Sequence, residues 1–97
     1  MTRMAVRVEV FGLVQGVYFR VSARHEALHA GVCGWVRNRR DGGVEALYQG
    51  PSEAVDRLVA WSHVGPRGAR VDEVRVRETE PDPRFESGFS VIKDLPS

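Results

Sequence analysis

The sequence predicts an α+β fold of the ferredoxin-like kind, with two helices on one face of an antiparallel sheet. Segments with the period-2 alternation of half-buried strands recur along the chain, and two segments of helical composition separate them. The resulting order is βαββαβ with a short C-terminal strand added, which is the order of this fold. The length of 97 residues fits a single domain over residues 1–97 with one hydrophobic core.

The first strand and the first helix lie on either side of a glycine-containing junction. Residues 4–11 carry Met or Val at every even position, the alternation of a half-buried strand. Residues 21–30 contain neither Gly nor Pro, and Gly31 is a suitable C-terminal cap, so a helix is predicted there. Residues 12–20 therefore form a strand-to-helix junction.

The first helix has two apolar faces that could turn inward. One is a stripe at helical spacing made of Phe19, Ala23, Ala27 and Ala30. Val21 and Leu28 lie on nearly the opposite side. We expect the alanine stripe to face the core, because small side chains let a helix sit close to a sheet.

A β-hairpin and a second helix follow. Residues 32–38 and 44–49 have strand composition, and the turn 39–43 contains an Asp-Gly pair, which favours a tight antiparallel connection. A Gly-Pro pair ends the hairpin. The helix 52–62 then begins with a serine that can cap it and ends near a second Gly-Pro pair.

The last third of the chain predicts one long strand and one short one. Residues 69–78 alternate with a single shift of phase near Glu73, which predicts a β-bulge. Residues 80–87 contain two prolines and several charges and are expected to form a loop. A short strand is predicted over residues 89–92.

The composition bounds the compartment and the classes of partner. With 42% hydrophobic residues, no stretch approaching the roughly 18 apolar residues of a membrane span, and no signal-peptide pattern, the expectation is a cytoplasmic protein without membrane contact. A net charge of +1 gives no global reason to expect nucleic acid. The single Cys33 cannot form an internal disulfide and is expected to be a small buried residue.

The junction reads GLVQGVYFR over residues 12–20 and is a candidate phosphate cradle. Backbone N–H groups converge at the start of a helix, where an anion is favoured. Gly12 and Gly16 permit unusual backbone angles, and Arg20 adds a fixed positive charge. Taken alone, the two glycines fit a tight loop without a ligand equally well.

Two long motifs resemble the acylphosphatase family. They read VFGLVQGVYFR over residues 10–20 and GWVRNRRDGGVEALYQG over residues 34–50, with the spacing of the family kept throughout. The similarity extends to Trp61 and to residues 65–74 and so covers nearly the whole chain.

The resemblance implies an enzyme that hydrolyses the carboxyl–phosphate bond of small acyl phosphates to a carboxylate and inorganic phosphate, with no metal or other cofactor. Arg20 and Asn38 are the implied catalytic residues: Arg20 contacts the phosphate oxygens, and Asn38 orients the attacking water. Backbone amides are implied to bind the phosphate, and the substrate-binding residues that supply them are Gln15, Gly16, Val17, Tyr18 and Phe19.

Elementary chemistry fits these roles. Phosphoryl transfer spreads negative charge over the equatorial oxygens, which fixed donors and a cation stabilise. Asn38 can donate and accept hydrogen bonds, which suits the positioning of water, although a neutral amide is a poor base. Because an acyl phosphate has a good leaving group, a strong base or a metal is less necessary, and the phosphate of the substrate is a candidate proton acceptor.

Other sequence features have competing interpretations. The segment HEALH, residues 25–29, matches a zinc-protease pattern on a predicted helix, but no third ligand is assigned. Arg37, Arg39 and Arg40 fit either a solvated hairpin end or a patch that attracts an anionic substrate. An RNA-binding module of the same layout and a phosphate-binding regulatory domain without turnover are the rival functions. A monomer is the default expectation.

Overall fold

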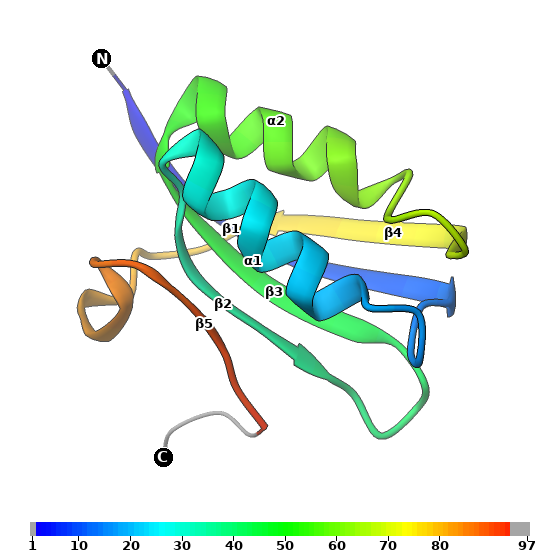
Figure 1. Cartoon of the computed structure of the whole chain (residues 1–97). Coiled ribbons are helices and arrows are strands. Elements are labelled where there is room, and N and C mark those ends of the chain that lie inside the picture. The colour runs from blue at the N-terminus through cyan, green and yellow to red at the C-terminus, as the bar shows by residue number, and fades with distance from the viewer. Residues whose placement is uncertain (1, 94–97) are drawn as a thin grey trace.

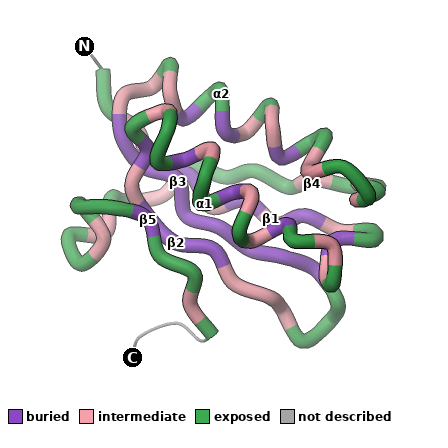
Figure 2. Tube along the Cα trace, viewed as in Figure 1, coloured by how far each residue is buried: buried purple, intermediate pink, exposed green. Residues whose placement is uncertain are grey.

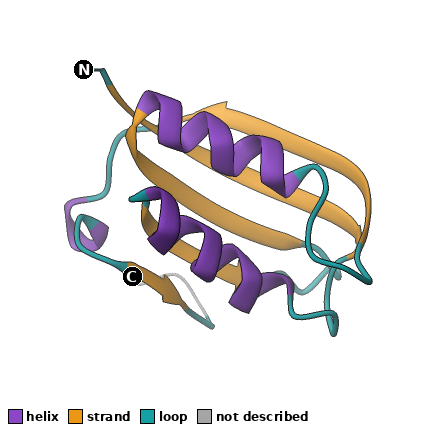
Figure 3. Ribbon diagram, turned by 45° about the horizontal axis from the view of Figure 1, so that its top comes forward, coloured by secondary structure: helices purple, strands orange, loops and turns teal. Residues whose placement is uncertain are grey.

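A five-stranded sheet with both helices on one face forms the protein (Figures 1 and 3). The computed structural model describes residues 2–93. Its elements are β1 (Arg3–Leu13), α1 (Phe19–Ala30), β2 (Cys33–Asn38), β3 (Val44–Pro51), α2 (Ser52–Ser62), β4 (Arg70–Glu78), the 3-10 helix η1 (Pro83–Phe85) and β5 (Phe89–Val91). The sheet order is β4-β1-β3-β2-β5. The predicted ferredoxin-like α+β fold is confirmed.

The main core lies between the helices and the sheet, where the tube of Figure 2 is buried. Ala23 and Ala27 of α1 are fully buried, whereas Val21 and Leu28 are 62% and 45% exposed. The alanine stripe is thus the inward face, as predicted. The helix begins two residues earlier than expected, so Phe19, also buried, belongs to its first turn.

The short strand β5 makes the sheet mixed and not purely antiparallel as expected. It pairs with β2 in parallel, with Gly34 opposite Phe89. The reason is topological: β4 ends at the same end of the sheet at which β2 begins, so a chain that crosses to that edge continues alongside β2 in the same direction. Cys33, at the start of β2, is only partly buried, contrary to expectation, and its thiol donates to the Glu86 carbonyl at 3.1 Å.

The predicted bulge lies in β4. The pairing with β1 passes from Phe11 opposite Glu73 to Gly12 opposite Val71, which leaves Asp72 without a partner in the ladder. At this place the two backbones approach so closely that a Cβ on Gly12 would lie 2.1 Å from the Arg70 carbonyl oxygen. Gly12 is therefore required inside β1 by this contact, and it lies outside the loop that leads into α1.

Candidate active site

The loop between β1 and α1 leaves the start of the helix open to an anion. Tyr18 precedes α1 with φ 61°, in the left-handed region that side chains rarely adopt, and it is 81% exposed. Within the described part of the chain no side chain caps the first turn, and this turn contains no acidic residue. Its N–H groups and the positive end of the helix dipole are thus available to a negatively charged ligand.

A pocket of about 390 Å³ lies at this helix start. Its lining residues are Val14, Gly16, Tyr18, Phe19, Arg20, Val21 and Asn38. The structure thereby brings together five of the seven predicted site residues, although Arg20 and Asn38 are 18 positions apart in the sequence. The other two, Gln15 and Val17, belong to the same loop but do not line the pocket.

The Arg20 side chain is partly buried in the wall of this pocket. Arg7, Arg37 and Arg39 are all engaged by carboxylates. Within residues 2–93 the Arg20 guanidinium has no ion pair with a carboxylate and no hydrogen bond to one. Its donors are accordingly free to meet an anion that enters the pocket.

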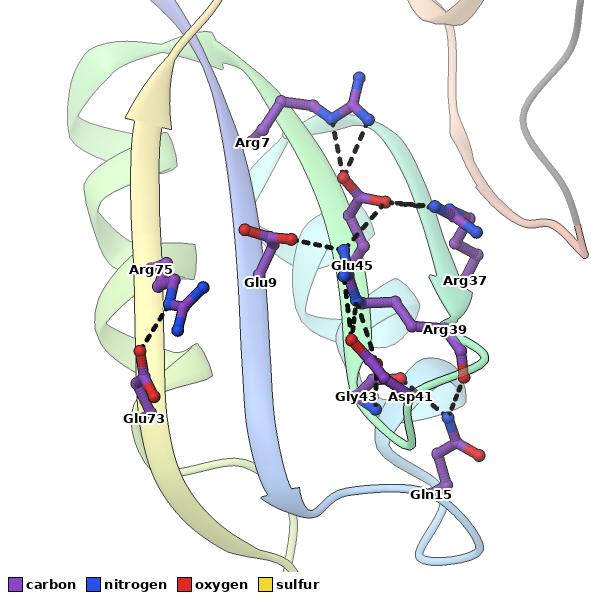
Figure 4. Close-up of polar contacts among 10 residues, drawn as sticks. All are labelled: Arg7, Glu9, Gln15, Arg37, Arg39, Asp41, Gly43, Glu45, Glu73 and Arg75. Carbon is purple, nitrogen blue, oxygen red and sulfur yellow. Dashed lines mark hydrogen bonds and ion pairs between the residues drawn. The ribbon is translucent and has the colours of Figure 1, made fainter.

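Asn38 reaches the pocket because it is the last residue of β2, where side chains alternate between the two faces of the sheet. Its neighbours Arg37 and Arg39 extend over the open face and bind carboxylates there, as Figure 4 shows. Asn38 therefore faces the helices. Its Oδ1 is buried and, within the described part of the chain, is the one buried side-chain polar atom without a hydrogen-bond partner.

An unpartnered buried oxygen is costly, because its lost hydration is worth about 1–3 kcal/mol. Such an atom in the wall of an open pocket is satisfied when a donor from outside the protein occupies the pocket. Among the described residues, Asn38 therefore gives the pocket wall a side chain with an unsatisfied hydrogen-bond acceptor.

Gln15 connects the loop to the hairpin that carries Asn38. Its Nε2 donates to the backbone carbonyls of Arg39 and Gly43, both at 2.8 Å (Figure 4). These two bonds hold the loop before α1 against the β2–β3 turn. Sequence reasoning assigned Gln15 only a backbone amide and missed this side-chain contact. The sequence signal that could have indicated this contact is the position of Gln15, a long polar side chain in a loop whose other residues are apolar, aromatic or glycine.

The other side of the hairpin is fixed by a buried carboxylate on the open face of the sheet. Glu45 of β3 is 4% exposed and accepts hydrogen bonds from Arg7 at 2.9 Å and from Arg37 at 2.6 Å. Burial by itself raises the pKa of the Glu45 carboxyl, but the hydrogen bonds and charges of the two arginines outweigh it and hold the pKa below its ordinary value. Arg39 adds an ion pair with Glu9 of β1.

The histidine pair of the HEALH segment does not build a metal centre. Over residues 2–93, no three His, Cys, Asp or Glu side chains gather in a way that could hold a metal ion. His25 instead lies beside Trp61 in a separate hollow. None of the helices described here is long and apolar enough to cross a membrane.

Comparison with known proteins decides the family. The model of the family Acylphosphatase matches residues 6–91, which include the loop, Arg20 and Asn38. The chain belongs to the acylphosphatase family.

Relatives named acylphosphatase match most of their own length. The protein of Rubrobacter xylanophilus is 55% identical over 86 residues, which cover 89% of this chain and 77% of that protein. The protein of Thiobacillus denitrificans is 51% identical over 89 residues, which cover 92% and 97%. The acylphosphatase structure from Coxiella burnetii superposes with a TM-score of 0.87 at 34% identity and 93% coverage of both chains. Family membership and this level of identity support acylphosphatase activity for the chain.

Proposed function

We propose that this chain hydrolyses small acyl phosphates in the pocket at the start of α1, with Arg20 binding the phosphate oxygens and Asn38 directing the attacking water. One observation carries the proposal: Asn38, whose buried Oδ1 has no partner within the described residues, lines the same pocket as Arg20. A phosphate held at Arg20 would thus lie beside an acceptor that can hold water.

Two features support binding of the phosphate at the helix start. The first-turn amides have no side-chain cap, and the Arg20 guanidinium supplies a permanent positive charge. In the transition state negative charge spreads over the equatorial oxygens, and donors that are already in place stabilise it without reorganisation. The amides of Gln15, Gly16, Val17, Tyr18 and Phe19 are the proposed donors.

Asn38 positions the nucleophile. A water molecule donates one hydrogen bond to Oδ1, which aims a lone pair at the phosphorus. The bond from the water oxygen to phosphorus forms while the bond from phosphorus to the acyl oxygen breaks, and the carboxylate leaves. The described residues of the pocket wall include no carboxylate or imidazole, so the water proton passes to an oxygen of the transferred phosphate.

The test is hydrolysis of acetyl phosphate by the purified protein in excess chelator. Turnover is expected to persist, and Arg20→Ala and Asn38→Ala should each lower kcat at least about a hundredfold, on the order of 3 kcal/mol. Arg57→Ala, which removes an exposed arginine of α2, is the matched control and should leave kcat unchanged.

Calorimetric titration with inorganic phosphate separates the two roles. Arg20→Ala should weaken phosphate binding, whereas Asn38→Ala should retain it because its task is to hold water. A folded Arg20→Ala variant with nearly full activity contradicts the assignment of the cradle. A wild-type protein that binds phosphate but shows no turnover would instead be a phosphate-binding regulatory domain.

A further inference from the structure

Two additional hollows each share one lining residue with the pocket at the start of α1. The first has a volume of about 440 Å³ and is lined by Arg37, Asn38, Arg39, Arg40, Asp41 and Lys93. The second, of about 300 Å³, is lined by Val21, Ser22, His25, Glu26, Trp61 and Pro66. The basic hollow meets the pocket at Asn38, and the more apolar one meets it at Val21.

The direction of attack decides between them. In an in-line displacement the incoming water and the departing acyl oxygen lie on opposite sides of the phosphorus. If Asn38 holds the water, the acyl group extends away from Asn38 and from the basic hollow that begins there. The hollow that begins at Val21 then remains for the acyl group.

We propose that this second hollow, between α1 and the end of α2, is the acyl subsite, and that it selects an apolar acyl group about the size of a benzene ring. The inference rests on the function proposed above. It assigns the part of the substrate that the phosphate contacts leave unspecified.

Val21, Trp61 and Pro66 form the apolar part of the subsite wall, beside the polar Ser22, His25 and Glu26. Trp61 packs on the buried Phe19 of the first turn of α1, with ring centroids 5.1 Å apart. The chain after α2 packs against the Phe19 ring: a Cβ on Gly65 would lie 3.0 Å from an atom of this ring. Pro66 is thereby placed beside Val21 and His25, one helical turn apart on α1.

The exposed apolar surface at this place favours the same occupant. Val21 is 62% exposed and Tyr18, at the rim of the phosphate pocket, is 81% exposed. Apolar surface that is removed from water on binding stabilises a complex. A methyl group as small as that of acetyl phosphate covers little of it, whereas an aryl acyl group covers much more.

The experiment compares kcat/KM for acetyl, benzoyl and succinyl phosphate, which share the phosphate and differ in the acyl group. We expect benzoyl phosphate to be preferred. Val21→Ser should reduce the ratio of benzoyl to acetyl kcat/KM about tenfold, the range for a small change in an apolar pocket. Leu28→Ser removes a similarly exposed apolar side chain of α1 outside the hollow and should leave the ratio unchanged.

A second variant, Trp61→Leu, removes the aromatic wall, and it should lower the same ratio in protein whose circular dichroism is that of the wild type. The proposal is overturned if both variants lower all three rates in proportion. It is equally overturned if succinyl phosphate is preferred and Arg40→Ala abolishes that preference, because the basic hollow would then hold the acyl group. A wild-type protein that hydrolyses none of the three contradicts the proposed function itself.

Discussion

The two faces of the sheet differ in whether polar side chains at neighbouring positions of β2 have hydrogen-bond partners. On the open face Arg37 reaches the buried carboxylate of Glu45, which Arg7 also contacts. On the helix face, one residue further along, the Oδ1 of Asn38 is buried without a partner among the described residues. The first arrangement satisfies its buried charge from within the chain, and the second leaves a buried acceptor without a partner among the described residues.

This difference separates residues that stabilise the hairpin from residues proposed to act on a substrate. A buried charge that keeps its partners holds strands together, and its loss is felt in the free energy of unfolding. A buried polar atom without a partner lowers stability, and it persists where function requires it. Substitutions on the two faces should therefore change stability and activity in opposite ways.

The largest effect is expected for Glu45→Ala on the open face. It leaves Arg7 and Arg37 without their shared carboxylate and should lower the free energy of unfolding by roughly 3 kcal/mol, measured by urea denaturation. Glu73→Ala is the matched control, since its pair with Arg75 is exposed to solvent and should contribute little to stability. Equal losses in the two variants would remove the distinction between buried and exposed pairs.

A smaller effect, on turnover, is expected for Gln15→Leu. The leucine keeps the approximate size but loses both bonds to the hairpin, so the loop and Asn38 are no longer held together. We expect kcat to fall about tenfold, or roughly 1.4 kcal/mol, with little change in KM.

Gln49→Leu provides the control for Gln15. The Gln49 amide also donates to two carbonyls, those of Asp82 and Phe85, but on the other face and away from the pocket. It should lower stability and leave kcat unchanged. If both glutamine variants lower kcat alike, Gln15 has a general structural role and does not position the site.

The sequence predicted the fold because its local signals agree with one another. The Asp-Gly turn, the alternating strands and the alanine stripe of α1 each fit the same two-layer arrangement, and the phase shift near Glu73 located the bulge. The parallel pairing of β5 could not be predicted in this way. It depends on which end of the sheet the chain has reached after β4, which no local pattern encodes.

The candidate site was predictable to a similar degree. The two motifs assigned Gly16, Arg20 and Asn38 to one site, and the structure brings these residues into one pocket wall. The side-chain role of Gln15 was not predictable, because its acceptors are 24 and 28 residues away and are backbone carbonyls with no residue signature. The need for glycine at position 12 likewise comes from the passing β4 backbone and not from the loop.

The comparison also predicts a gain of stability on the helix face. Asn38→Ala removes the buried unpartnered oxygen and should raise the free energy of unfolding by about 1 kcal/mol in phosphate-free buffer, although it loses turnover. Urea denaturation of this variant beside the wild type measures the change. A loss of 1 kcal/mol or more would mean that the Asn38 side chain stabilises the hairpin, contrary to its proposed role.

The smallest effect is expected in the pH dependence of stability. The pKa of Glu45 lies below its ordinary value of 4.5 in the folded protein, so the folded state favours the carboxylate over the protonated acid. The ionised Glu45 carboxylate makes its full contribution to the free energy of unfolding above about pH 6. This contribution is lost as the pH falls through 4.5 and then through the lower folded pKa. In Glu45→Gln this dependence is absent, so the free-energy difference between wild type and variant should narrow in acid and stay constant from pH 6 to about pH 8. Parallel curves throughout the acid range would mean that the carboxyl titrates alike in the folded and unfolded chain. The open face would then owe its order to packing and not to charge.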